Sequence, residues 1–217
     1  SVVTGVLNIW AQHAVALNER VAALDAAHGP RTVVGLGIGS PAGAVAHGRE
    51  YGSPLASMSD YLDELLIDAD RLLLGALGPR MVDLAAKRTA GWHPFLVTPS
   101  YVASSRGHVG DAPFLAPYQA VVLDTDAVRA RDTARAAIGT FIGFPTYRAN
   151  LRRMGFGEDD LVPGGSDRLI DALVAHGTAD DVAERIRAQH DAGADHVAVH
   201  VLTNSPDLPL AQWRELF

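Results

Sequence analysis

Short apolar runs alternate with longer segments of helical periodicity along the chain, and this alternation limits the possible folds more than any other feature. We expect strands at six runs rich in Val, Ile and Leu: Val2–Asn8, Thr32–Gly39, Arg71–Ala76, Gly91–Val97, Tyr118–Asp124 and His196–Leu202. Most of these runs are apolar on both faces, which is typical of parallel strands covered by helices. The intervening periodicity predicts helices at Ala11–Ala27, Ser57–Ile67, Arg80–Thr89, Pro99–Ser105, Asp126–Ile142, Ser166–His176 and Asp180–Ala192. Strands that alternate with helices predict βαβ crossovers and a parallel α/β fold.

The length and spacing of these segments indicate one domain over residues 1–217. The interval from about 125 to 195 is longer than one crossover needs, and it contains at least three predicted helices and the glycine-rich loop Gly155–Gly165. We therefore expect a helical insertion there, placed over one end of the sheet, where α/β proteins usually carry their sites.

Charge and composition exclude several classes of function. Lys and Arg total 18 against 25 Asp and Glu, for a net charge of −7, and no basic stripe suggests a nucleic-acid partner. No apolar run reaches the roughly 18–20 residues that a membrane span needs. The chain has no cysteine, which excludes disulfides, thiolate metal sites and cysteine nucleophiles. We expect a cytoplasmic protein with a small-molecule substrate.

The first glycine run is Gly35-Leu-Gly37-Ile-Gly39-Ser-Pro. A dinucleotide fingerprint needs Gly-x-Gly-x-x-Gly leading directly into a helix, and this run has a different spacing, followed by a loop-like stretch. The small residues favour a barrel strand whose backbone a flat ligand can approach at the carboxyl end. The alternative is that the glycines only permit close packing between strands.

The second glycine run, Gly75-Ala76-Leu-Gly78-Pro79-Arg80, joins a predicted strand to a predicted helix. Backbone N–H groups at that helix N-terminus can bind phosphate, and Arg80 can add a positive charge. The alternative is a plain turn with a solvated arginine.

Three histidines are candidates for chemistry. His93 stands near a strand end and could donate a hydrogen bond to a ligand carbonyl, although its spacing alone somewhat favours a structural role in a partly buried position. His196 and His200 are expected on one face of a strand, but no third ligand accompanies them, so we expect no metal site. The sequence also has no nucleophile elbow and no Gly-x-x-x-x-Gly-Lys phosphate loop, which disfavours hydrolases and kinases.

Several segments together resemble the bacterial luciferase-like superfamily, specifically the actinobacterial oxidoreductases that use the deazaflavin coenzyme F420. They occur in family order and span nearly the whole chain. The matching segments are Thr4-Gly-Val-Leu-Asn-Ile-Trp10, Val34-Gly-Leu-Gly-Ile-Gly39, Ala76-Leu-Gly-Pro-Arg-Met81, His93-Pro-Phe-Leu-Val-Thr-Pro99, Asn150-Leu-Arg-Arg-Met-Gly-Phe156 and Gly193-Ala-Asp-His-Val197.

The resemblance implies a (β/α)8 TIM barrel with the cofactor at the carboxyl ends of the strands. It makes Thr4–Asn8 the third strand, which in the family often carries a non-proline cis peptide under the deazaflavin ring. It also makes Gly75–Arg80 a phosphate contact after the fifth strand. The family's first two strands have no counterpart here, so either roughly 60 residues are absent before Ser1 or the barrel is incomplete.

By this resemblance the chain transfers a hydride between F420 and a small organic substrate. The implied pocket residues are Trp10 and His93, with His93 the candidate catalytic group. The implied cofactor-binding residues are Gly5, Val6, Asn8, Gly39, Ala76, Gly78, Pro79 and Arg80.

Two other functions stay open. One is an FMN-dependent luciferase-like monooxygenase; the other is a non-catalytic barrel relative that acts through a dimer surface. We expect a homodimer in each case, because family members tend to be dimers and because exposed sheet edges favour pairing with another chain.

Overall fold

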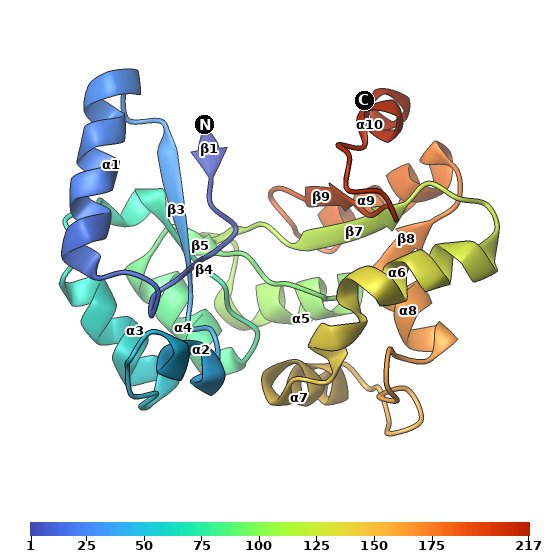
Figure 1. The fold of residues 1–217 in the computed structure, drawn as a ribbon, viewed down its shortest axis with the longest axis horizontal. Coiled ribbons are helices and arrows are strands. Elements are labelled where there is room, and N and C mark those ends of the chain that lie inside the picture. Colours follow the sequence, from blue (N-terminus) through green and yellow to red (C-terminus); the bar gives the residue numbers. More distant parts are fainter. The chain divides into compact units, whose positions relative to one another are not determined.

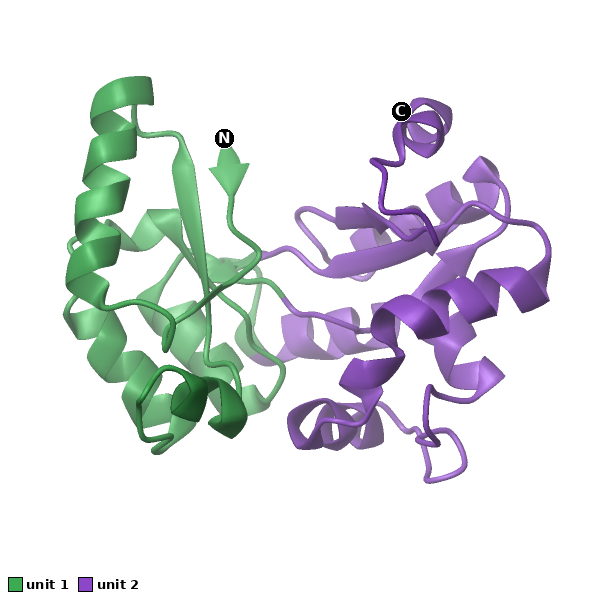
Figure 2. Cartoon of the chain, viewed as in Figure 1, with its two compact units in different colours: residues 1–93, 109–114 green, residues 94–108, 115–217 purple.

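The computed structural model describes residues 1–217, and the path of the chain is shown in Figure 1. The chain forms two compact units, coloured separately in Figure 2. Unit 1 comprises residues 1–93 and 109–114, and unit 2 comprises residues 94–108 and 115–217. No helix is both long enough and apolar enough to cross a membrane.

The sheet of unit 1 is built around β3 (Thr32–Gly37) and β4 (Leu72–Leu74), which pair in parallel. On one side, β1 (Val2–Val3) and β2 (Leu7–Asn8) both pair with β3 in parallel, one after the other. On the other side, β5 (Gly91–Trp92) pairs in parallel with β4, and β6 (Phe114–Leu115) pairs with β5. Because β3 and β4 are rich in Val and Leu and nearly fully buried, they form the apolar centre of the unit.

The helices of unit 1 follow the strands in βαβ order. They are α1 (Ala14–His28), α2 (Pro41–Ala46), α3 (Pro54–Asp63), a 3₁₀ turn at Ala69–Arg71 and α4 (Pro79–Arg88). Helix α1 packs on β3, and α4 packs on β4 and β5. Arg71 donates two hydrogen bonds of 2.7 Å to the carboxylate of Asp25 and a third of 3.0 Å to the carbonyl oxygen of Thr32. This arginine therefore ties α1 to the start of β3.

Unit 2 holds a second parallel sheet, in the order β8 (Val174–His176), β7 (Tyr118–Val122), β9 (Ala198–Val201). Its helices are α5 (Pro99–Val109), α6 (Ala127–Ile142), α7 (Pro145–Arg153), α8 (Asp167–Leu173), α9 (Ala179–Asp191) and α10 (Leu210–Leu216). The buried core joins the apolar faces of α6 and α8 to β7 and β8 through Ile138, Ile142, Leu169, Leu173 and their neighbours. Arg131 of α6 binds Asp171 of α8 at 2.6 Å, which fastens the same two helices at the surface.

The prediction of a parallel α/β fold is confirmed, with several differences in detail. The predicted first strand is two short strands, β1 and β2, and the peptide bond between Gly5 and Val6 that separates them is cis. The predicted strand Gly91–Val97 ends at Trp92; further along it, Leu96 has a φ of +54°, which is incompatible with a strand. The end of the predicted helix Ser166–His176 is instead strand β8, and the stretch expected to be a loop after Pro41 forms α2.

Candidate functional site

The carboxyl ends of four strands meet at one edge of the sheet in unit 1. The register aligns Leu7 of β2 with Leu36 of β3, Leu36 with Leu74 of β4, and Leu74 with Trp92 of β5. The next residue on each strand is Asn8, Gly37, Gly75 and His93. Backbone hydrogen bonds continue past this row, from Gly75 N–H to Leu36 O and from His93 N–H to Leu74 O, both at 2.8 Å. Sequence-predicted site residues from different strands are thereby brought to one edge, the usual place for sites in barrels of this kind.

The glycines of β3 and β4 make room for the chain's own Thr4–Val6 segment. A Cβ on Gly35 would collide with the carbonyl oxygen of Thr4, and a Cβ on Gly37 would lie 2.6 Å from Cγ2 of Val6. The same Val6 methyl would lie 3.4 Å from a Cβ on Gly75. At Gly35 and Gly37 the structure thus corresponds to the close-packing alternative and not to a strand surface left open for a ligand. Val6 is itself 39% exposed, so the segment that covers the glycines forms part of the accessible surface.

Asn8, Trp10 and Gly39 form one structural group at the end of β3. The Asn8 Oδ1 atom accepts a hydrogen bond from the Trp10 backbone N–H at 3.0 Å, and the Asn8 amide lies 2.8 Å from the Cβ position of Gly39. Gly39 has a φ of +61°, a conformation that favours glycine. The indole Nε1 of Trp10 donates to the carbonyl oxygen of Ile38 at 2.5 Å, and Trp10 is only 7% exposed. Trp10 and Asn8 therefore hold the backbone of this strand end.

His93 and Gly5 lie next to each other. The Nε2 atom of the His93 ring is 3.4 Å from the Cβ position of Gly5, and the His93 side chain is half-buried. Gly5 and Val6 are exposed. An imidazole therefore faces an accessible stretch of backbone, where it can exchange a hydrogen bond with a bound molecule.

The second glycine run forms the expected strand-to-helix connection. Ala76 is buried, Gly78 is the N-cap of α4, and Pro79 occupies the first helical position. No side chain caps this helix, since Gly78 has none to offer. Arg80 is exposed and forms no ion pair. The first turn of α4 thus presents an uncapped positive helix end beside an unpaired cation.

The two other histidines considered from the sequence lie in unit 2, as do the arginines of α7. His196 precedes β9, so it is not in the strand that contains His200, and the His200 Nδ1 atom is hydrogen-bonded to the Tyr118 hydroxyl at 2.8 Å. Arg148 and Arg152 both bind Glu158, at 2.8 and 2.7 Å. Their positive charges are already paired within the unit.

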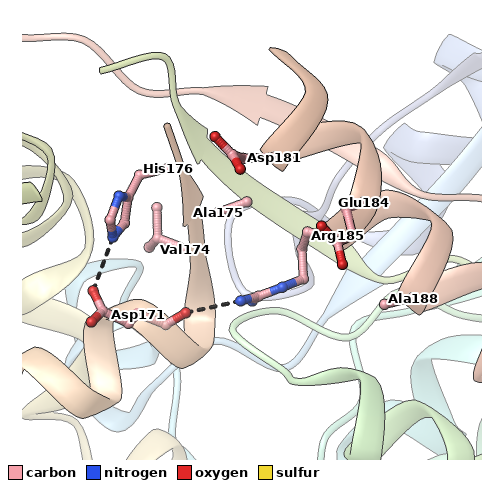
Figure 3. A pocket seen from close by; sticks show the side chains of 8 residues that line it. All are labelled: Asp171, Val174, Ala175, His176, Asp181, Glu184, Arg185 and Ala188. Atoms are coloured by element: carbon pink, nitrogen blue, oxygen red, sulfur yellow. Dashed lines mark hydrogen bonds and ion pairs between the residues drawn. The ribbon is translucent and has the colours of Figure 1, made fainter. Parts of the chain in front are cut away.

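A cavity of about 420 Å³ opens in unit 2 between α8, β8 and α9 (Figure 3). Its polar groups are held by one another and by neighbouring residues. The Arg185 guanidinium donates to the carbonyl oxygens of Ala172 and Asp171 at 2.8 and 3.0 Å, and burial lowers the pKa of Arg185. The Asp171 carboxylate binds His176 at 3.0 Å, and the Asp181 carboxylate accepts a hydrogen bond from the backbone N–H of Thr178, the N-cap of α9. Because most of these groups already have partners, the cavity is a weaker candidate than the strand ends of unit 1.

No model of a known protein family matches the sequence. The chain is 23% identical over 244 residues to the 5,10-methylenetetrahydromethanopterin reductase of Methanolobus tindarius, covering 89% of this chain and 75% of that protein.

Three solved structures share the fold. An F420-dependent secondary alcohol dehydrogenase, solved with an F420-acetone adduct, has a TM-score of 0.71 at 13% identity, covering 94% of this chain and 74% of the other. The coenzyme F420-dependent tetrahydromethanopterin reductase of Methanopyrus kandleri has a TM-score of 0.67 at 18% identity, covering 94% of this chain and 78% of the other. The EDTA monooxygenase of Chelativorans sp. BNC1 has a TM-score of 0.64 at 13% identity, covering 94% of this chain and 69% of the other.

These likenesses define the fold. The fold is that of the luciferase-like TIM barrels, present here as part of a (β/α)8 barrel with parallel sheets. The resemblance drawn from the sequence is confirmed at the level of the fold, and the similar proteins are two reductases, a dehydrogenase and a monooxygenase.

Proposed function

We propose that the chain transfers a hydride between the deazaflavin coenzyme F420 and a small organic substrate. The observation that carries this proposal is the group of side chains and backbone at the carboxyl ends of β2 to β5, where His93 faces the exposed Gly5–Val6 segment. The proposal is supported by the F420-dependent enzymes among the structures that share the fold.

The residues at this edge fit such a cofactor. Gly5 and Val6 offer an accessible backbone surface for a flat ring, whereas Ala76 at the end of β4 is buried and contacts a ligand only if the ring displaces its neighbours. The uncapped start of α4 and the unpaired Arg80 suit the phosphate of the cofactor. When bound, the deazaflavin supplies the carbon that carries the hydride.

The chain's own residues would orient and bind the cofactor and the substrate. His93 would donate a hydrogen bond to a polar atom of the ring or to the carbonyl of the substrate. Asn8 and Trp10 would keep the end of β3 in place through their bonds to the backbones of Trp10 and Ile38. Gly78 would allow the phosphate to approach the backbone, and Arg80 would add its charge.

The second candidate is an FMN-dependent luciferase-like monooxygenase, which the likeness to the EDTA monooxygenase favours. A third, from a different class, is a non-catalytic relative that acts through a dimer surface; it is favoured by the exposed edge at β1, where Val2 and Val3 are 57% and 53% exposed.

The three candidates can be separated by titrating the purified chain with F420 and with FMN, following the fluorescence of each ring. Hydride transfer through F420 predicts saturable binding of F420 at least tenfold tighter than that of FMN. Tighter binding of FMN would support the monooxygenase instead. Binding of neither cofactor would leave the non-catalytic candidate.

A further inference from the structure

Two polar features of unit 1 have no role in the function described so far. One is the contact between His13 and Arg49, and the other is the buried hydroxyl of Tyr61. Arg49 lies in the loop after α2, and its backbone N–H binds the carbonyl oxygen of Ala44 at 3.0 Å. In the same loop, the ring of Tyr51 packs against Trp10 with 5.6 Å between the centroids. Since Trp10 is bonded to the end of β3, the loop lies at the carboxyl side of the sheet.

The charge of Arg49 is not neutralised by any carboxylate. Its Nη2 atom contacts the ring nitrogens of His13, at 2.5 Å from Nδ1 and 3.1 Å from Nε2. Two other arginines of the unit, Arg71 and Arg88, bind Asp25 and Asp63. A guanidinium has five N–H donors in a fork that matches carboxylate and phosphate oxygens. Contact with one imidazole leaves most of these donors of Arg49 unused.

The hydroxyl of Tyr61 is a second unused polar group. Tyr61 is 6% exposed, and its hydroxyl oxygen is buried with no hydrogen-bond partner. Buried polar groups are normally paired, so this orphaned hydroxyl indicates a missing hydrogen-bond partner. Burial raises the pKa of Tyr61, while the charge of Arg49 lowers it and that of Glu64 raises it.

We propose that Arg49, assisted by the Tyr61 hydroxyl and held by His13, binds an anionic oxygen group of a small molecule at the carboxyl end of β3. The group is a phosphate or a carboxylate, because both match the fork of the guanidinium and both accept the O–H of a phenol. The inference rests on the proposed function in taking this sheet edge as the ligand-binding edge. The charged group would belong either to the cofactor or to the substrate.

The test uses inorganic phosphate and acetate as probes, titrated into the 217-residue chain by isothermal calorimetry. Arg49→Gln should weaken the binding of the probes at least tenfold, a loss of roughly 1.4 kcal/mol. Arg49→Lys should recover part of the affinity, since the charge stays while the fork is lost. The matched control is Arg31→Gln, which removes the same charge from an exposed, unpaired arginine just before the start of β3, at the opposite end of the strand.

Tyr61→Phe provides a second variant that keeps the fold. It removes an unsatisfied hydroxyl and leaves the ring, so the chain should be at least as stable as the wild type. The affinity for the probes should nevertheless fall about tenfold or more, because a hydrogen bond to a charged oxygen is lost. A merely structural role of Tyr61 would leave the affinity unchanged.

Repeating the phosphate titration in the presence of saturating F420 identifies the source of the charge. Because Arg80 is proposed to bind the cofactor phosphate, this titration uses the Arg80→Ala variant. Competition between F420 and phosphate in that variant assigns Arg49 to the cofactor, and undiminished phosphate binding assigns it to the substrate; both results support the anion site. The inference is overturned if the wild type binds neither probe, or if Arg49→Gln and Arg31→Gln weaken binding equally. If F420 itself does not bind, the proposed function fails, whereas the phosphate titration still decides the role of Arg49.

Discussion

The Nε2 atom of His93 lies 3.4 Å from the position where a side chain on Gly5 would begin. The contact joins the residue after β5 to the segment between β1 and β2. In the sheet, β3 and β4 lie between β5 and these two strands. Gly5 is exposed and His93 is half-buried, so the pair borders the accessible side of the sheet edge. This pair is the centre of the proposed site.

Replacing His93 should affect the ligand more than the fold. His93→Ala is expected to raise the dissociation constant for F420 roughly 2- to 10-fold, the loss of one hydrogen bond of about 0.5–1.5 kcal/mol. Fluorescence titration measures this constant. Gly5→Ala is a useful companion, because its methyl group would meet only the movable His93 ring at ordinary contact distance. We expect its melting temperature to stay near that of the wild type. Unchanged F420 affinity in His93→Ala would remove His93 from the site.

Val6 and Gly37 are predicted to be energetically coupled. Gly37→Ala should destabilise the chain by about 1–3 kcal/mol, because the new Cβ would lie 2.6 Å from Val6 Cγ2. Adding Val6→Ala should recover most of this loss, since the remaining Val6 Cβ is 3.7 Å away. Urea unfolding of the single and double variants measures the coupling. Gly52→Ala, with only Ser57 Oγ at 3.7 Å, is the neutral control. Strictly additive losses would contradict the contact.

Arg80 is predicted to bind the phosphate end of the cofactor. Arg80→Ala should raise the dissociation constant for F420 tenfold or more, since charged hydrogen bonds contribute roughly 1.5–3 kcal/mol. The melting temperature of the chain without cofactor should not change, as Arg80 is exposed and unpaired. Gly78→Val should likewise weaken binding more than folding, by blocking the approach to the backbone. Equal affinities of wild type and Arg80→Ala would place the phosphate elsewhere.

The stability of unit 2 should depend on pH through Asp171. Hydrogen bonds from Arg131 lower the pKa of Asp171, and His176 lowers it further. A carboxyl group with a lower pKa in the folded state stabilises the fold above its ordinary pKa, and this contribution disappears as the pH falls through the folded value. Asp171→Asn should therefore lower the melting temperature at about pH 7 and have little effect near about pH 2. Asp191→Asn, at an exposed residue of α9 that forms no ion pair, is the control. A pH-independent difference for Asp171→Asn would contradict this role.

The open edge of β1 is predicted to take part in a homodimer. Val2 and Val3 are exposed, and β1 pairs only with β3. Light scattering should report a dimer at micromolar concentration, and Val3→Lys should shift it toward monomer. Val45→Lys, at a 71% exposed position on α2, should leave the dimer intact. A wild-type chain that is monomeric would contradict this prediction.

The sequence predicts the long elements of this fold better than the short ones. Strand β3 and helix α6 were located nearly to the residue, because each has a long apolar pattern and clear flanking signals such as the Asp126 cap. Strand β8 was missed because Val174–His176 continues the apolar pattern of α8 without a break. Helix α2 begins with Ser40 as cap and Pro41 at the first position, a signal that the surrounding glycines obscured.

The sequence predicts that the candidate site lies at the carboxyl ends of the strands, but it does not predict which residues meet there. The register that places Asn8, Gly37, Gly75 and His93 in one row depends on tertiary pairing, which spacing in the sequence does not reveal. The cover of Gly35 and Gly37 by Thr4 and Val6 is likewise a contact between segments distant in the chain. Arg49 and Tyr61 carried no motif, and only their unpaired polar atoms in the folded chain distinguish them.

Hydrogen–deuterium exchange with and without F420 tests the location of the proposed site most directly. Binding at the carboxyl ends of the strands predicts slower exchange at residues 5–10, at residues 75–80 and around His93. No change is expected at the cavity in unit 2 formed by residues 171–188. Slower exchange confined to that cavity, or no change anywhere at saturating F420, would contradict the assignment of the site to the sheet of unit 1.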